Sequence, residues 1–305
     1  MDHPLISIII PCYNYGRLLP RAVASVFAQN TDNAEVLTIN DGSSDDSAEV
    51  MTRLQEQYPE LRVIDQENAG AAATRNRGVD ECSGRFLVFL DADDELDASA
   101  LEAVSHAIEQ APDARVIIGG HTSVSADGRE KYHPVSPVAA SGSQRFADYL
   151  NKKLALSNGA VFFHRSVFDK TRYPEDCRNS EDIPVFAHAV ALFNCAQVDC
   201  SLAKIHKHDD SLRHNMSYAD DVALRVVDYV FDPSIVPAES MKLRRSYQAQ
   251  RCLSLFRSYY LANDRARAKK YYRLAVEADK RSLFKWTYLR KFLRVLTSPS
   301  SKSTR

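Results

Sequence analysis

The stretch FLVFLDADDELD, residues 86–97, joins a run of apolar residues to a group of acidic ones. Its first five residues have the composition of a buried strand, and Asp91, Asp93 and Asp94 follow almost at once. Neighbouring carboxylates repel one another, and burying an unpaired charge is costly. We therefore expect a positively charged group to bind where this strand ends.

This strand belongs to an alternating series in the first part of the chain. Apolar, β-branched runs recur at 5–10, 35–40, 61–65, 85–90 and 114–120. Helical patterns lie between them near 17–29, 45–57, 70–81 and 98–110. The alternation predicts an α/β fold with a mostly parallel sheet flanked by helices. In such sheets, ligands bind at the C-terminal ends of the strands.

Polar sequences follow the predicted strands at this edge. The first strand ends in PCYN (11–14), the second in NDGSSDDS (40–47), and ENAGAAATRNRG (67–78) follows the third. Each could be a turn or a helix cap, and the acids of DADD could cap the helix at 98–110. An aromatic residue and an aspartate at adjacent strand ends also suit a nucleotide base. Aspartates after a strand suit Mg²⁺ or Mn²⁺, which bind substrate phosphates.

The composition is that of an ordinary soluble protein, with 45% hydrophobic and 26% charged residues. No apolar stretch approaches the roughly 18–20 residues needed to cross a bilayer, and the N-terminus lacks the features of a signal peptide. The six cysteines form no CxxC pair, which favours reduced thiols. We expect a cytoplasmic protein.

The motifs follow the order seen in one enzyme family. The order is Pro11-x-Tyr13-Asn14, Asp41-Gly42-Ser43-Ser44-x-Asp46, Asn68-x-Gly70 with Thr74-Arg75-Asn76, Asp91-x-Asp93-Asp94 and Glu181-Asp182. From about residue 5 to 215 the chain resembles the family-2 glycosyltransferases of GT-A fold. The resemblance implies a GT-A nucleotide-diphospho-sugar transferase domain at 1–216, with a nucleotide half (about 1–95) and an acceptor half (about 96–216). A basic helical extension, 217–305, follows.

The resemblance assigns the nucleotide site to matching positions. Tyr13 is expected to stack on the base or line its pocket, and Asp41 to hydrogen-bond the imide of uracil or thymine. Arg75 is expected to help hold the nucleotide, while Asp91 faces the ribose and the sugar. The remaining nucleotide-binding positions are Pro11, Asn14, Asn68 and Gly70.

The resemblance also assigns metal ligands and a catalytic base. Asp93 is expected to bind the Mg²⁺ or Mn²⁺ that bridges the diphosphate, with His208 as a further ligand and His206 as its alternative. Asp182 is expected to deprotonate the acceptor hydroxyl in an inverting transfer. Glu181 and Asp182 could instead be first-turn acids that complement a helix dipole.

The function implied is transfer of one sugar from a UDP- or dTDP-sugar to a lipid-linked, lipopolysaccharide or exopolysaccharide acceptor. The enzyme would be a hexosyl-, N-acetylhexosaminyl- or rhamnosyltransferase. The Gln-x-x-Arg-Trp motif of processive synthases is missing, so one sugar per encounter is expected. A sugar nucleotidyltransferase would need a glycine-rich basic loop after the first strand, and PCYNYGRLLP (11–20) is glycine-poor. A non-catalytic membrane-docking protein predicts a broken carboxylate set, whereas Asp91, Asp93 and Asp182 are present.

The end of the chain is strongly basic. Residues 241–305 carry 18 Lys/Arg and three acids, a net charge of +15. Because the net charge of the whole chain is −1, the preceding part carries −16. In the last helical pattern an apolar side is predicted, made of Trp286, Leu289, Phe292, Leu293 and Leu296. A basic amphipathic helix favours contact with the inner face of the cytoplasmic membrane. Packing on the catalytic domain is the alternative. Nucleic acid is not expected, because no reader motif is present.

Overall fold

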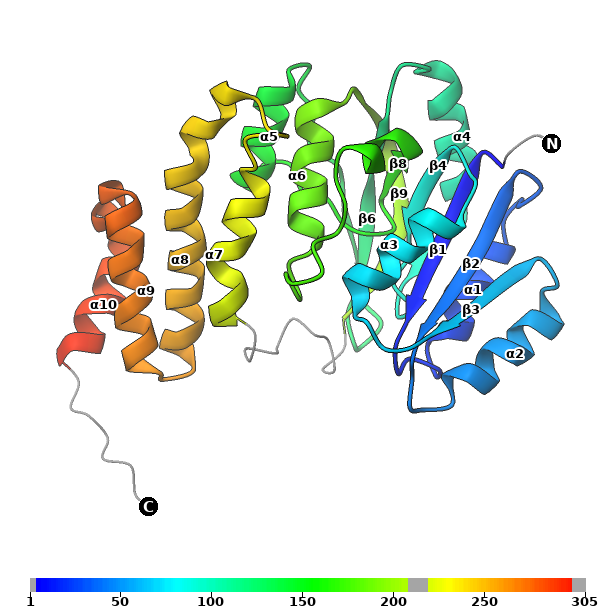
Figure 1. Ribbon diagram of the computed structural model, residues 1–305, viewed down its shortest axis with the longest axis horizontal. Helices are drawn as coiled ribbons and strands as arrows, with labels where there is room; N and C mark the ends of the chain where they lie inside the picture. The colour runs from blue at the N-terminus through cyan, green and yellow to red at the C-terminus, as the bar shows by residue number, and fades with distance from the viewer. Residues whose placement is uncertain (1–3, 208–218, 298–305) are drawn as a thin grey trace. The chain divides into compact units, whose positions relative to one another are not determined.

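The computed structural model describes residues 4–207 and 219–297. The chain divides into two compact units, Met1–His214 and Asn215–Arg305. The first unit combines a sheet with flanking helices, and the second is helical (Figure 1).

One sheet forms the centre of the first unit. Within the described residues it has nine strands in the order β3-β2-β1-β4-β8-β6-β9-β5, and β7 pairs with β6. Strand bounds are β1 Ile6–Cys12, β2 Ala34–Asp41, β3 Leu61–Gln66, β4 Phe86–Phe89, β5 Glu95–Leu96, β6 Val116–Val124, β7 Glu130–His133, β8 Val161–His164 and β9 Cys195–His206. The β1–β2, β2–β3, β1–β4 and β6–β9 ladders are parallel, and those of β5, β7 and β8 are antiparallel. The mostly parallel sheet predicted from the sequence is confirmed.

Helices cover both faces of this sheet, because successive side chains of a strand point to opposite sides. Ile6, Ile8 and Ile10 of β1 pack in one core with α1 (Leu19–Phe27), α2 (Ser47–Gln57) and α4 (Ala100–Gln110). Ile9 packs in the other with α3 (Ala71–Glu81) and α6 (Asp182–Leu192), which lie in front of the sheet in Figure 1. Two buried faces explain why these strands are continuous apolar runs. The other helices of the unit are α5 (Gly142–Leu150) and the 3₁₀ helix η1 (Arg165–Asp169).

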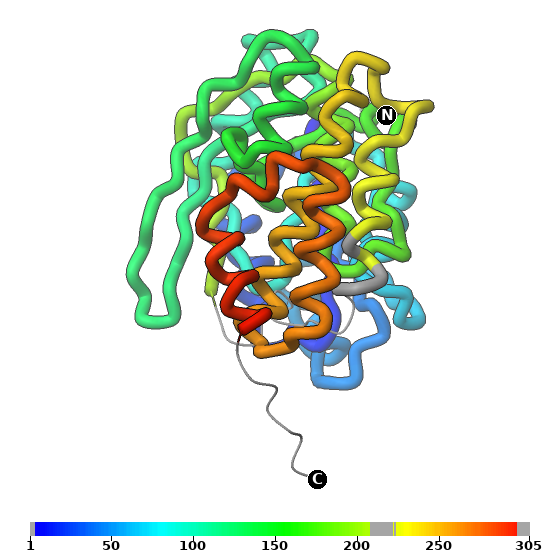
Figure 2. The backbone as a smooth tube through the Cα atoms, turned by 90° about the vertical axis from the view of Figure 1, so that its left-hand side faces the viewer, coloured from blue at the N-terminus to red at the C-terminus, as the bar shows by residue number. Residues whose placement is uncertain are grey.

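The second unit is built from four α-helices within residues 219–297, namely α7 (Ala219–Val230), α8 (Arg244–Leu261), α9 (Arg265–Ala278) and α10 (Trp286–Thr297). Two 3₁₀ helices, η3 (Ala238–Leu243) and η4 (Lys280–Phe284), connect them. Figures 1 and 2 show α8, α9 and α10 side by side. Their shared core is aromatic, with the rings of Tyr272 and Phe292 stacked at 4.0 Å. The predicted C-terminal helical extension is confirmed.

The predicted apolar side of α10 is divided in the structure. Leu289 and Phe292 pack into the core of the second unit. Trp286, Leu293 and Leu296 are exposed instead. The predicted apolar residues of α10 are therefore only partly covered by the other helices of this unit, and three of the five remain exposed. None of the helices in the described part of the chain has the length and apolarity needed to cross a bilayer.

Candidate active site

The carboxyl ends of β1, β2 and β4 lie together at one edge of the sheet. The parallel β1–β2 ladder pairs Cys12 with Asn40, and β4 runs parallel to β1 on its other side. The residues at or just after these strand ends therefore share one edge, where α/β proteins bind their ligands. They are Tyr13, Asp41 and Asp91.

The DADD turn gives its carboxylates different surroundings. The N–H of Asp94 donates to the carbonyl of Asp91 at 2.9 Å, which closes the turn. Asp94 is buried, and its Oδ1 accepts the N–H of His206 at 2.8 Å, so it ties the turn to β9. Asp91 and Asp93 are only partly buried. These two carboxylates can therefore reach a ligand, whereas Asp94 stabilises the turn.

Arg75 of α3 connects two acidic side chains that are distant in the sequence. Its Nη2 donates to Asp91 Oδ1 and its Nη1 to Glu181 Oε1, each at 2.8 Å. Burial by itself lowers the pKa of Arg75, but the negative charges of Asp91 and Glu181 raise it by a larger amount. The net pKa lies above its usual value, so the guanidinium stays charged. Breaking a buried ion pair leaves an uncompensated charge and typically costs about 3–5 kcal/mol. Arg75 therefore holds Asp91 beside the start of α6.

Asp182 is the first residue of α6 and directly follows Glu181. Burial and repulsion by Glu181 raise the pKa of Asp182 to about 6, against the opposing effect of Arg75. A carboxylate whose pKa lies near neutrality is a better general base than an ordinary aspartate. Glu181 makes no side-chain cap to the helix, since its carboxylate binds Arg75. Asp182 is an acid in the first turn of α6, so it can complement the helix dipole, and its raised pKa also suits a general base.

Asp41 is surrounded by donors from its own chain. Its Oδ1 accepts from Gln66 Nε2 at 2.7 Å and from the N–H of Ala69 at 2.8 Å, and its Oδ2 accepts the N–H of Gly70 at 2.9 Å. Asn68 Nδ2 adds a bond to the Asp41 carbonyl at 2.9 Å. Gly70 has a φ of +92°, which side-chain-bearing residues rarely adopt. Asp41 therefore positions the loop before α3, a role that the sequence reasoning missed.

We expect Asp41→Asn to destabilise the protein by about 1–3 kcal/mol, because the new amide turns a donor toward the partly buried N–H of Ala69 or Gly70. The matched control is Asp65→Asn on β3, since the exposed Asp65 accepts only a side-chain bond from Asn40 at 2.8 Å. Urea unfolding measures both free energies. Equal losses in the two variants would contradict the role given to Asp41.

The turn after β1 is joined to the loop after β2 by Asn14. Asn14 has a φ of 58°, a left-handed conformation that asparagine tolerates. Its Oδ1 accepts the N–H of Ser44 at 2.7 Å, and its own N–H donates to Ser43 Oγ at 3.0 Å. Tyr13 beside it is 48% exposed, so its ring can stack on a ligand. Pro11 lies within β1.

The described residues contain no group of three side chains that could hold a metal ion by themselves. At the end of β9, His206 Nε2 lies 2.6 Å from Glu95 Oε1, so that ring nitrogen already has a partner. His208 lies outside the described residues. A metal at this edge would therefore need ligands from a bound substrate in addition to protein side chains.

Residues 7–172 match Glycosyl transferase family 2. The chain belongs to this family. It is 42% identical over 91 residues to the uncharacterized glycosyltransferase YibD of Escherichia coli K12, which is 30% of this chain and 26% of that protein. It is 33% identical over 118 residues to glycosyltransferase GlyG of Streptococcus pneumoniae, or 38% and 39% of the two chains. The matches span less than half of these relatives.

Solved structures of similar fold include Staphylococcus aureus TarS. The structure of TarS 1–349 in complex with UDP-GlcNAc aligns over 95% of this chain and 88% of that one, with a TM-score of 0.70 and 16% identity. At this identity the similarity shows the fold alone. The GT-A fold expected from the sequence is confirmed.

Two residues that contact the candidate active site were not predicted from the sequence. Asn158 Nδ2 donates to Asp91 Oδ2 at 3.4 Å. The guanidinium of Arg75 lies over the ring of Tyr173, 5.6 Å from its centroid. The Asn-Gly pair at 158–159 signals a turn, and Gly159 has a φ of 76°. Nothing in the local sequence distinguishes Tyr173 from an ordinary core tyrosine.

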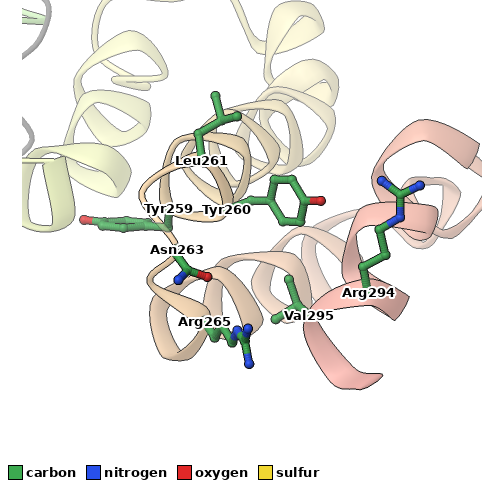
Figure 3. A pocket seen from close by; sticks show the side chains of 7 residues that line it. All are labelled: Tyr259, Tyr260, Leu261, Asn263, Arg265, Arg294 and Val295. Carbon is green, nitrogen blue, oxygen red and sulfur yellow. The ribbon is translucent and has the colours of Figure 1, made fainter. Parts of the chain in front are cut away.

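A cavity of about 440 Å³ lies in the second unit, between the junction of α8 with α9 and helix α10 (Figure 3). Its lining residues are Tyr259, Tyr260, Leu261, Asn263, Arg265, Arg294 and Val295. No carboxylate is among them, so this cavity lacks the acidic side chains of the candidate active site.

Proposed function

We propose that this chain is a metal-dependent, inverting glycosyltransferase that moves one sugar from a UDP- or dTDP-sugar to an acceptor hydroxyl. The observation that carries the proposal is the Arg75 bridge, with contacts of 2.8 Å to Asp91 and to Glu181, the neighbour of Asp182. This bridge holds the carboxylate of Asp91, just after β4, close to Asp182, the candidate base. TarS, of similar fold, was solved with UDP-GlcNAc, which supports a UDP-sugar as donor.

The nucleotide would lie across the ends of β1 and β2. The exposed ring of Tyr13 offers a stacking surface for the base. The loop of Asn68 and Gly70, held by Asp41, would form the opposite wall. The imide N–H of the base would donate to an Asp41 oxygen that already accepts a hydrogen bond from the chain. Asp91 would face the ribose and the sugar.

Asp93 would hold Mg²⁺ or Mn²⁺ against the diphosphate. Asp93 is a partly buried acid of the turn that follows β4, at the edge of the sheet where α/β proteins bind their ligands, and this place fits a cation. Such ions commonly take one or two carboxylates and complete their coordination with substrate phosphates and water. When bound, the ion stabilises the negative charge of the leaving diphosphate.

Asp182 would accept the proton of the acceptor hydroxyl as the hydroxyl oxygen bonds to the anomeric carbon. The bond from that carbon to the diphosphate breaks, and the nucleoside diphosphate leaves with the electron pair. Attack from the face opposite the leaving group inverts the configuration. The hexose, N-acetylhexosamine or deoxyhexose transferred, and its lipid-linked, lipopolysaccharide or exopolysaccharide acceptor, are part of the same proposal.

Product analysis separates this function from sugar nucleotidyl transfer. The full chain is incubated with UDP- and dTDP-sugars, with and without Mn²⁺, and separately with nucleoside triphosphates and sugar 1-phosphates. Metal-dependent release of a nucleoside diphosphate from at least one sugar donor supports the proposal. Pyrophosphate release from the second mixture, without diphosphate release from the first, would favour the nucleotidyltransferase. The absence of both products would favour a docking protein without catalytic activity.

We propose that the second unit places the enzyme on the inner face of the cytoplasmic membrane. Phe284 is 85% exposed and Trp286 64% exposed, and Leu293 and Leu296 on α10 are also exposed. Basic residues lie beside them in the chain, namely Lys280, Arg281, Lys285, Arg290, Lys291 and Arg294. Exposed aromatic residues among basic ones suit an anionic bilayer surface. A lipid-linked acceptor would then be reached at that surface.

We expect the double variant Phe284→Ser and Trp286→Ser to bind phosphatidylglycerol-containing vesicles at least about tenfold more weakly, since each lost aromatic insertion removes about 1.5–3 kcal/mol. Vesicle sedimentation measures the partition coefficient. Tyr132→Ser is the control, because Tyr132 is 45% exposed on β7 of the first unit. Wild-type binding by the double variant would rule out this surface.

A further inference from the structure

Buried polar atoms without hydrogen-bond partners are concentrated in the candidate active site. In the described part of the chain, nine buried side-chain nitrogen or oxygen atoms lack a partner. Four of the nine belong to residues around Asp91, namely Arg75 Nε, Asn158 Oδ1, Tyr173 Oη and Glu181 Oε2. An unpaired buried polar group costs free energy, and native proteins contain few of them. A concentration of four at one place indicates atoms that bond a ligand.

The four residues are linked by contacts. Arg75 donates to Glu181 Oε1 at 2.8 Å, and its guanidinium lies over the ring of Tyr173. Arg75 also donates to one oxygen of Asp91, and Asn158 donates to the other. The unpartnered atoms therefore belong to one group of touching side chains, which we call the Arg75 cluster (Arg75, Asp91, Asn158, Tyr173 and Glu181).

The surrounding chain holds these side chains in place. Asn76 of α3 accepts the N–H of Tyr173 at 3.0 Å and donates to its carbonyl at 2.9 Å. Gly159, next to Asn158, donates its N–H to the carbonyl of Phe89 at 2.7 Å. Burial raises the pKa of the Tyr173 hydroxyl well above its usual range, so it keeps its proton. Tyr173 and Arg75 thus offer two fixed donors, and Asn158 and Glu181 two fixed acceptors.

We propose that the Arg75 cluster binds the hydroxyl groups of the transferred sugar, with Asn158 and Tyr173 as specificity-determining residues. Each sugar hydroxyl donates one hydrogen bond and accepts others, which matches two donors and two acceptors. Asp91 is 34% exposed and forms the entrance. Its contact with Asn158, at 3.4 Å, is long for a hydrogen bond, so a sugar hydroxyl can displace it at little cost.

The charges around the cluster select the class of sugar. Three carboxylates, on Asp91, Glu181 and Asp182, face the single guanidinium of Arg75. With the carboxylate of Asp93 and the +2 charge of the proposed metal ion included, the net charge is still −1, so the carboxylate of a uronic acid would meet net repulsion here. The sugar is therefore a neutral one. This inference rests on the proposed glycosyl transfer and adds to it the residues that recognise the sugar.

Isothermal titration of the full chain with Mn²⁺ tests the inference. The ligands are UDP-glucose, UDP-galactose, UDP-GlcNAc, dTDP-rhamnose and UDP-glucuronate, with UDP and dTDP as references. The variants are Tyr173→Phe and Asn158→Ala. The matched control is Tyr272→Phe, because Tyr272 carries the same unpartnered buried hydroxyl in the second unit.

In the wild type, we expect one neutral donor to bind more tightly than its own nucleoside diphosphate. In each of the two variants the ratio of donor affinity to diphosphate affinity falls about tenfold, which is the effect of one lost hydrogen bond. The affinity for the diphosphate itself is unchanged. Tyr272→Phe binds as the wild type does. The Tm of free Tyr173→Phe does not fall, because the deleted hydroxyl has no partner to lose.

Three results would overturn the inference and leave the proposed function standing. They are an undiminished ratio of donor to diphosphate affinity in both variants, no sugar donor that binds more tightly than its diphosphate in a wild type that binds UDP or dTDP, and UDP-glucuronate binding as tightly as the best neutral donor. A wild type that binds none of these nucleotides would contradict the proposed function itself.

Discussion

Replacing Asp182 by Asn is expected to slow sugar transfer by about 10²- to 10⁴-fold, the usual contribution of a positioned general base. The amide keeps the size and shape of the carboxylate, so donor binding should be almost unchanged. The variant should therefore lose kcat with little change in the Kd of the nucleotide sugar. Asp113→Asn, at an exposed position between α4 and β6, is the control and should transfer at the wild-type rate. Wild-type turnover by Asp182→Asn would remove Asp182 from the role.

The pH profile tests the same residue independently. Burial raises the pKa of Asp182 to about 6, so the ionised base is present above that pH and lost as the pH falls through it. Wild-type kcat should therefore fall about tenfold per pH unit below pH 6. The residual activity of Asp182→Asn should lack this step. A step of the same size in both proteins would assign the titration to another group.

Removing the Asp93 carboxylate is the second large effect. We expect Asp93→Ala to lose the strengthening of UDP binding by Mn²⁺ and to transfer sugar slower by a factor on the order of 10³, because a metal contributes several kcal/mol to stabilising the leaving group. Binding of UDP without metal should change little. Titration of UDP with and without Mn²⁺ measures both quantities.

Two control variants test whether the loss of the Mn²⁺ effect is specific to Asp93. Asp113→Ala removes an exposed carboxylate from the other end of the sheet and should keep the Mn²⁺ effect. Asp94→Ala should instead lower the Tm, because Asp94 accepts the N–H of His206 at 2.8 Å. An Mn²⁺ effect that persists in Asp93→Ala would contradict the metal assignment.

The α/β architecture could be predicted because its signals are local. The apolar runs at 5–10 and 35–40 are β1 (Ile6–Cys12) and β2 (Ala34–Asp41), with ends shifted by one or two residues. The order of the later strands could not be predicted. Val116 pairs with both Phe163 and Cys195, and pairings over such separations leave no local pattern.

The candidate site was predicted in part for the same reason. Its strand-end acids stand out in the sequence, but their division of labour depends on distant partners. Arg75 reaches Glu181 across 106 residues, and the separate role of Asp94 follows only from its bond to His206. Asp41 is engaged by its own loop for a similar reason. The ligand contacts assigned to Tyr13, Asp91, Asp93 and Asp182 stay predictions.

Thermal unfolding with nucleotide sugars tests the central claim most directly. The full chain is heated with UDP- and dTDP-sugars in turn, with and without Mn²⁺, and the Tm is compared with that of the free protein. A donor at 100 times its Kd should stabilise the protein by about 2.7 kcal/mol. The account predicts a metal-dependent rise in Tm with at least one donor, and a smaller rise in Asp93→Ala. No rise with any nucleotide sugar, alongside a rise with nucleoside triphosphates or anionic lipid, would contradict it.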